Sequence, residues 1–186
     1  ALPFLILTDG LSAGISVKMR FPSLKGTSHQ RKSMYGNLLI AIDGSELSME
    51  ALRNGIKLAQ SLGASMVIAT VTEKWSALEV AAQVRCGENH PIERYEEAAR
   101  EAAARILEQA KSLADELNAE CRVIHVADQH PATGIVALAK EQGCDLIIMG
   151  SHGRSGLEKA LLGSVAQNVL TLSPVPVLID KAASAN

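Results

Sequence analysis

The residues best suited to bind a ligand form a glycine pattern near the end of the chain. The pattern is Gly150, two residues, Gly153, nine residues, Gly163 and Ser164. Six mostly apolar residues precede it, as in a buried parallel strand, and a helical pattern follows from Val165. A strand end, a loop of small residues and a helix N-terminus together direct backbone N–H groups and a positive dipole end at one place. Because glycines also let a phosphate approach the backbone closely, the pattern predicts a phosphate-binding loop.

Glycines in such a loop also have a simpler interpretation, because they often serve only to turn the chain between a strand and a helix. A lone pair of glycines at this spacing favours that interpretation. The second glycine with its serine, and Arg154 beside the first pair, favour a ligand instead. Arg154 itself is either a phosphate-binding cation or an exposed loop cation. The sequence has neither a P-loop motif nor a dinucleotide fingerprint after its first strand, which excludes those two nucleotide-binding classes.

Strand-like and helix-like segments alternate along most of the chain. Apolar strand patterns occupy residues 38–42, 66–71, 122–126, 144–149 and 175–179. Helical patterns begin after the expected N-cap Ser45, at Pro91, at Pro131 and after Ser164, with a short helical piece at 77–84 and an expected helix stop at Gly63. The long helix from Pro91 carries one apolar stripe from Ile92 to Leu117. Five strands alternating with helices predict an α/β domain with an open parallel sheet and helices on both faces.

Three separated motifs in a fixed order give the chain a specific resemblance to a known family. They are the glycine pattern, the opening MYGNLLIAIDGSE at residues 34–46 and the closing SPVPVLI at residues 173–179. On these motifs the sequence resembles the ATP-binding universal stress proteins from residue 34 to about residue 181. The resemblance implies a Rossmann-like fold of the adenine-nucleotide α-hydrolase type, with strand order 3-2-1-4-5. That order creates a switch point between the first and fourth strands, where ligands of open sheets bind.

Asp43 and Gly150 would both lie at this switch point, which is the strongest argument from the residues for a nucleotide site. Asp43 either caps the following turn or contacts ribose hydroxyls or a divalent cation, and the resemblance favours the nucleotide pocket. The resemblance also implies that the backbone of Val71 meets the adenine, although a valine there is ordinary core as well. Met149 is expected in the core, with a contact to adenosine. The predicted nucleotide-binding residues are Asp43, Val71, Met149, Gly150, Gly153, Arg154, Gly163, Ser164 and Val165.

The five histidines show no metal-type spacing. His152 lies inside the glycine loop, where it could contact phosphate or act as a base. No Ser or Cys nucleophile with an ordered acid partner is evident in the sequence, so a surface or phosphate-contact role is favoured. His125 and His130 flank the end of the third strand and are interpreted as structural or rim residues.

Composition limits the remaining classes. The 186 residues, 47% of them hydrophobic, suffice for one well-buried domain. No apolar run approaches the roughly 18 residues of a membrane span, and a net charge of −2 with dispersed basic residues shows no nucleic-acid footprint. Of three cysteines, Cys121 and Cys144 are expected as reduced core residues, which favours the cytoplasm. Residues 1–33 are predicted to be a disordered N-terminal extension and residues 34–186 a single domain.

The predicted function is that of a stress-response regulator that binds ATP, with AMP or a cyclic nucleotide as other candidate ligands and Mg²⁺ held through the nucleotide. A dimeric switch with slow or no hydrolysis is expected. The alternatives are an ATP-hydrolysing or nucleotidyl-transferring enzyme and a nucleotide-free stress protein. The enzyme is disfavoured because the first turn, residues 43–46, has neither a phosphate loop nor a histidine pair. A homodimer is expected through the last strand, which begins at Val175 and ends at Ile179, together with an unidentified protein client.

Overall fold

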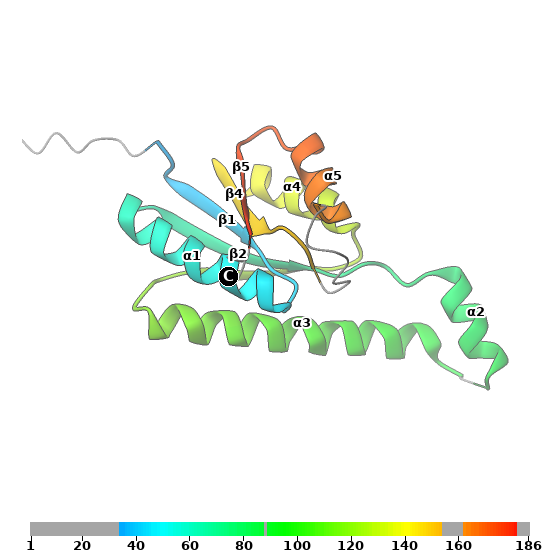
Figure 1. Cartoon of the computed structure of the whole chain (residues 1–186). Coiled ribbons are helices and arrows are strands. Elements are labelled where there is room, and N and C mark those ends of the chain that lie inside the picture. The colour runs from blue at the N-terminus through cyan, green and yellow to red at the C-terminus, as the bar shows by residue number, and fades with distance from the viewer. Residues whose placement is uncertain (1–33, 88, 154–161, 182–186) are drawn as a thin grey trace, which may run out of the picture. The chain divides into compact units, whose positions relative to one another are not determined.

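A five-stranded parallel sheet forms the centre of the structure, a computed structural model that describes residues 34–87, 89–153 and 162–181. In chain order the strands are β1 (Asn37–Ala41), β2 (Ser65–Val71), β3 (Arg122–Val126), β4 (Leu146–Gly150) and β5 (Val177–Asp180). They hydrogen-bond in the order β3-β2-β1-β4-β5, and every neighbouring pair is parallel (Figure 1). The predicted α/β fold and strand order are confirmed. The predicted extension, residues 1–33, lies outside the described residues.

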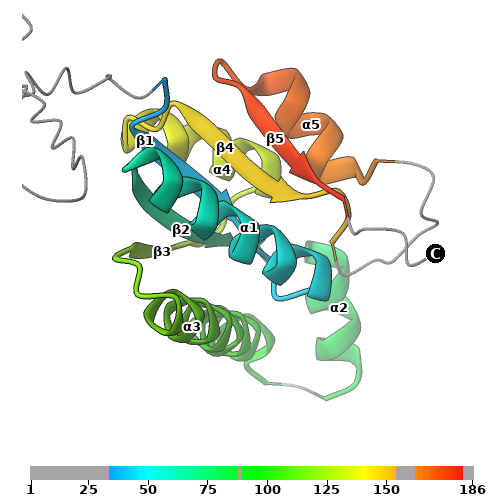
Figure 2. The ribbon, with the colours of Figure 1, turned by 60° about the vertical axis from the view of Figure 1, so that its left-hand side comes forward.

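Two pairs of helices cover the two faces of the sheet (Figure 2). The helices are α1 (Glu46–Leu62), α2 (Ala77–Arg85), α3 (Pro91–Glu116), α4 (Pro131–Glu141) and α5 (Ser164–Leu172). Leu38 and Ile40 of β1 pack with α1 and α3, whereas Leu39 and Ala41 pack with α4 and α5. Successive side chains of a strand point to opposite faces, so a continuously apolar strand is buried on both. This explains why all five residues of β4 are buried.

Both ends of α1 follow the signals in the sequence. Ser45 has extended backbone and its hydroxyl accepts a hydrogen bond from the N–H of Ser48 at 3.3 Å. Gly63 adopts the left-handed conformation, with φ of 63°, and its N–H donates to the carbonyl of Gln60 at 3.2 Å. These bonds satisfy backbone and side-chain groups that a helix end otherwise leaves to water.

Helix α3 departs from the predicted continuous apolar stripe. Apart from Pro91, its buried side chains begin only at Ala103, whereas Ile92 and Tyr95 are half-buried. Figure 1 shows the reason: the first turns of α3 extend past the ends of the strands toward α2. There the hydroxyl of Tyr95 donates to the carbonyl of Glu73 at 3.2 Å, in the segment that follows β2.

The last strand begins two residues later than predicted, at Val177 rather than Val175. Pro176 accepts a hydrogen bond from the N–H of Ile147 at 3.0 Å but has no N–H of its own to donate, so regular pairing starts after it. Strand β4 likewise begins at Leu146 instead of residue 144. Asp145, the residue before it, uses its carboxylate to accept hydrogen bonds from the N–H groups of Gly36 and Asn37 at the start of β1.

At Gly55, helix α1 packs closely on the sheet. A Cβ atom there would lie 2.8 Å from Cδ1 of Ile40 and 3.4 Å from Cδ1 of Ile148, so larger side chains overpack the core. We expect Gly55→Val to lower the free energy of unfolding by about 1–3 kcal/mol in urea titrations. Lys57→Val is the matched control, because it introduces the same side chain at an exposed position of the same helix. Equal effects of the two variants would contradict the close packing.

Candidate functional site

The site predicted from the sequence lies where β1 and β4 end side by side. The two strands are neighbours, with Ala41 opposite Met149. The helix after β1 packs on one face of the sheet and the helix after the β4 loop packs on the other. The carboxyl ends of β1 and β4 therefore form the switch point at which open sheets bind ligands. Asp43 follows β1, and the glycine loop follows β4.

Asp43 and Gly153 make the closest approach across this switch point. A Cβ atom at Gly153 would overlap Oδ2 of Asp43, so a larger residue there would force the carboxylate to move. Oδ1 of the same carboxylate accepts hydrogen bonds from the N–H of Ser45 at 3.0 Å and from its hydroxyl at 2.6 Å. Asp43 thus stabilises the turn before α1 through one oxygen and faces the glycine loop with the other.

Gly163 is held against the beginning of the same loop. Its N–H donates to the carbonyl of Ser151 at 2.9 Å, and a Cβ atom on Gly163 would lie 3.2 Å from that oxygen. The N–H of Ser151 donates in turn to the carbonyl of Asp180 at 2.9 Å. Backbone hydrogen bonds therefore join the end of β4, the start of α5 and the end of β5.

The N-terminus of α5 is the candidate anion-binding element of the site. Gly163 is its N-cap, in extended backbone and without a side-chain cap. The first bond of the helix runs from the N–H of Gln167 to the carbonyl of Gly163 at 3.0 Å. The N–H groups of Ser164, Val165 and the next residue precede that bond, so they have no partner within the helix. Such N–H groups, together with the helix dipole, favour an anion.

Val71 and Met149 occupy different positions relative to the gap between the carboxyl ends of β1 and β4. The N–H of Thr72 donates to the carbonyl of Val126 in β3 at 2.9 Å. Because backbone groups of a parallel strand alternate between its two neighbours, those of Val71 point toward the β1 side. The register of β1 with β2 ends at Ala41, so Val71 lies beyond the residues of β2 that pair with β1, and its predicted contact with adenine stays a prediction. The side chain of Met149 is 6% exposed in the core beneath α4 and α5, and its predicted contact with adenosine stays a prediction.

The comparison with known proteins agrees with the fold. The sequence model of the universal stress protein family matches residues 34–181. Universal stress protein YxiE of Bacillus subtilis (strain 168) is 37% identical over 150 residues, which cover 78% of this chain and 99% of the relative. The chain belongs to the universal stress protein family.

Two further members of the family provide structural comparisons. Universal stress protein MJ0577 of Methanocaldococcus jannaschii is 32% identical over 162 residues, covering 80% of this chain and 96% of the relative. Its solved structure aligns with a TM-score of 0.65 and 28% identity over 82% of this chain and 99% of that one. A universal stress protein solved in complex with cAMP aligns with a TM-score of 0.58 and 30% identity, over 80% and 99% of the two chains.

Sequence reasoning missed one polar contact of this universal stress protein domain. The hydroxyl of Thr72, after β2, and Nε2 of His125, in β3, are 2.8 Å apart. Burial lowers the pKa of His125, the nearby guanidinium of Arg100 lowers it further, and Asp128 opposes both. The structural role interpreted for His125 agrees with this contact, which joins neighbouring strands beside Val71. The pair is 53 residues apart in sequence, and no local pattern identifies it.

The other residues of interest lie apart from this gap or cannot be placed. Arg154 falls outside the described residues. His130 is the N-cap residue of α4, exposed and without a side-chain cap, as a rim residue would be. Of the cysteines, Cys144 is buried as expected, whereas Cys121 is only half-buried and Cys86 is exposed. Burial raises the pKa of the Cys144 and Cys121 thiols, so both are held in the neutral form.

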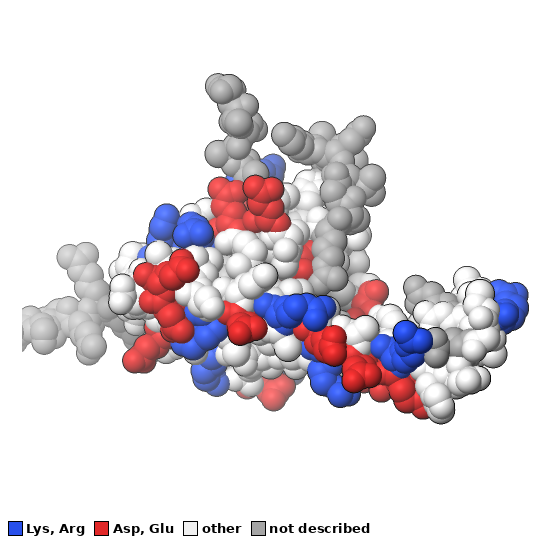
Figure 3. Space-filling model, turned by 90° about the horizontal axis from the view of Figure 1, so that it is seen from below, with Lys and Arg blue, Asp and Glu red and all other residues white. Residues whose placement is uncertain are grey.

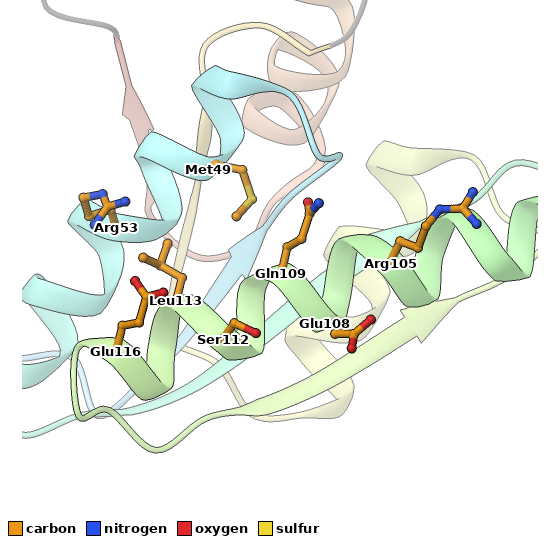
Figure 4. Close-up of a pocket in the computed structure, with 8 residues that line it drawn as sticks. All are labelled: Met49, Arg53, Arg105, Glu108, Gln109, Ser112, Leu113 and Glu116. Carbon is orange, nitrogen blue, oxygen red and sulfur yellow. The ribbon is translucent and has the colours of Figure 1, made fainter.

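A hollow of about 600 Å³ between α1 and α3 is not the predicted site (Figure 4). It contains none of the predicted nucleotide-binding residues. Its lining combines two arginines with two glutamates, so it offers no net positive charge to a phosphate. The lining residues are Met49, Arg53, Arg105, Glu108, Gln109, Ser112, Leu113 and Glu116. Figure 3 likewise shows acidic and basic side chains interspersed on the face that it displays, rather than a basic patch.

Two searches of the described residues limit other classes of site. Across residues 34–87, 89–153 and 162–181, His, Cys, Asp and Glu side chains form no group of three or more that could hold a metal ion. Within the same residues, none of the helices combines the length and the apolar character needed to cross a bilayer.

Burial of His125, reinforced by the guanidinium of Arg100, makes the stability of the domain dependent on pH. The pKa of His125 is lowered in the folded state, whereas an unfolded histidine titrates near about 6.5. As the pH falls through about 6.5, the unfolded chain binds a proton that the folded protein resists, so stability is lost on acidification and is complete above that pH. We expect His125→Gln to lose less stability than the unsubstituted protein between pH 7.5 and pH 5.5 in urea titrations. His90→Gln, at an exposed position, is the control, and identical pH slopes for all three proteins would contradict the assignment.

Proposed function

We propose that this universal stress protein domain binds an adenine nucleotide, ATP with Mg²⁺, at the carboxyl ends of β1 and β4. The observation that carries the proposal is the close approach of Asp43 to Gly153 beside the uncapped N-terminus of α5. A carboxylate for the ribose and a helix end for the phosphates are thereby adjacent. The relative of 30% identity solved with cAMP supports an adenine nucleotide as the class of ligand. AMP and cyclic nucleotides are the alternative candidates for the ligand that is bound in the cell.

Each part of the nucleotide would meet a different element of the site. The N–H groups of the glycine loop and of Ser164 and Val165 would hold the phosphates. Oδ2 of Asp43 would face the ribose, and the backbone of Val71 would meet the adenine. The described residues bring one carboxylate, that of Asp43, to this gap and no group of metal ligands, so Mg²⁺ would be held chiefly by phosphate oxygens and water.

Regulation by binding fits the site better than rapid catalysis. The turn after β1 uses the Asp43 carboxylate and Ser45 to start α1, and it contains no phosphate loop. We therefore infer a nucleotide-dependent switch with slow or no hydrolysis, acting on an unidentified protein client in the cytoplasm. Acid extraction of the purified protein followed by chromatography, repeated over hours with added ATP, separates the alternatives. Rapid loss of ATP would identify an enzyme, and absence of any bound nucleotide would favour a nucleotide-free stress protein.

Binding should appear as stabilisation of the folded domain. With ATP and Mg²⁺ at about a hundred times the dissociation constant, we expect roughly 2.7 kcal/mol of added stability, because the ligand binds only the folded state. A thermal melt with millimolar nucleotide measures the effect as a rise in Tm. An unchanged Tm would contradict the assignment of the loop.

A matched pair of glycine variants localises the effect. Gly163→Val should abolish the shift, because the side chain would fill the space where a phosphate reaches the helix N-terminus. Since a Cβ there already lies 3.2 Å from the carbonyl of Ser151, each variant is compared with its own ligand-free melt. Gly36→Val is the control, at an exposed position before β1 with ordinary room for a Cβ, and should retain the full shift.

We also infer a homodimer through β5. This strand lies at one edge of the sheet and β3 lies at the other, so each has a row of backbone groups open to pairing. Both edges expose one apolar side chain, Leu178 at 39% and Val123 at 40%. The β5 edge is also flanked by Leu170 and Leu172 of α5, which are 46% and 51% exposed. This additional apolar surface, together with the family resemblance, favours β5.

Lysine substitutions at the two edges test which one forms the dimer. Leu178→Lys should shift the protein from dimer to monomer in analytical ultracentrifugation, because it puts like charges opposite one another in an isologous contact. Val123→Lys is the matched control and should remain dimeric. Val177 is a poorer choice, because its half-buried side chain packs on the core beneath α4 and α5. Dissociation by the β3 variant alone would move the interface to the other edge.

A further inference from the structure

The glycine loop contains a buried side-chain nitrogen atom that makes no hydrogen bond with the described residues. Nε2 of His152 is buried and has no hydrogen-bond partner. Among the described residues, one other buried side-chain atom shares this condition, Oδ1 of Asn37 at the amino end of β1. Buried polar atoms are normally satisfied, and an exception requires an explanation, such as a bound ion or a functional role. The position of His152 at the carboxyl ends of the strands makes it the one of interest here.

The other ring nitrogen of His152 already has a partner. Nδ1 lies 3.2 Å from the hydroxyl oxygen of Ser151, whose side chain is buried. When that hydroxyl donates to Nδ1, the neutral ring carries its proton on Nε2. An anion at Nε2 can only accept a hydrogen bond, so it selects this tautomer. In this tautomer the ring presents Nε2–H as a donor, and none of the described residues supplies its acceptor.

The ring lies beside the N-terminus of α5, the candidate anion-binding end of that helix. Its Cδ2 atom, which is bonded to Nε2, is 3.9 Å from the position of a Cβ on Gly163. Gly163 is the N-cap of α5, and the carbonyl of Ser151 holds its N–H at 2.9 Å. One dipeptide therefore orients both the imidazole ring and the start of the helix. The unsatisfied nitrogen therefore lies near N–H groups that have no partner within the helix.

We propose that Nε2–H of His152 donates a hydrogen bond to a phosphate oxygen of the bound nucleotide. The proposal rests on the nucleotide site proposed above and adds a side-chain donor to a cradle made of backbone N–H groups. A phosphate is the part of the ligand that it recognises, because the base and the ribose belong to the Val71 and Asp43 ends of the site. His152 would therefore make the domain discriminate nucleotides from nucleosides.

Two substitutions separate this role from a merely structural one. The amide nitrogen of Gln can occupy the position of Nε2, whereas that of Asn reaches only the position of Nδ1, beside Ser151. We expect His152→Asn to weaken ATP binding by about 10- to 100-fold, as for loss of a hydrogen bond to a charged group. His152→Gln should retain most of the affinity. Both variants should bind adenosine as the unsubstituted protein does. Isothermal titration calorimetry with ATP, AMP and adenosine measures these affinities for the unsubstituted protein and both variants.

The outcomes distinguish this proposal from the proposed function. Normal ATP affinity in His152→Asn, or an equal loss for ATP and adenosine, overturns the phosphate contact while nucleotide binding stands. No binding of any nucleotide by the unsubstituted protein overturns both. Nitrogen-15 NMR of the imidazole in the unsubstituted protein gives a result that does not depend on the folding of a variant. ATP should shift the Nε2 signal of His152 and adenosine should not, and an unmoved signal with bound ATP overturns the contact.

Discussion

Parallel pairing of β1 with β4 is the interaction on which the site depends. Leu38 to Ala41 pair with Leu146 to Met149, and all eight side chains are buried. These strands are distant in sequence, yet their register fixes which residues meet where both end. It brings Asp43 so close to Gly153 that a Cβ there would force the carboxylate to move. A shift of one residue would separate the carboxylate from the loop and reverse the buried faces of the strands.

The glycine pattern was informative because it reflects backbone geometry rather than side-chain chemistry. At Gly153 and Gly163 another segment comes so close that an added Cβ would force a neighbouring atom to move. Helix signals at Ser45 and Gly63 were equally reliable, since each is a local hydrogen bond or a local backbone conformation. The strand order, by contrast, came from the family resemblance, because apolar strands of similar composition carry no record of their neighbours.

Other features escaped the sequence because they depend on tertiary structure. The contact of Thr72 with His125 requires β2 and β3 to be adjacent. The unsatisfied nitrogen of His152 requires knowledge of what buries a single atom. The half-buried start of α3 has the same apolar pattern as its buried end, and only the length of the strands decides which part is covered. Pattern identifies the elements, whereas the extent and register of packing decide the exposure of each residue.

A physical connection between the proposed nucleotide site and the last strand follows from one residue. The carbonyl of Asp180 accepts the N–H of Ser151, and its carboxylate accepts the side-chain amide of Asn54 at 2.7 Å. Asp180 therefore joins the glycine loop, β5 and α1 through short hydrogen bonds. If the dimer forms through β5, a ligand that fixes Ser151 acts on a group bonded directly to the interface strand. Any resulting coupling must be reciprocal, so dimerisation would change nucleotide affinity by the same factor by which nucleotide changes dimerisation.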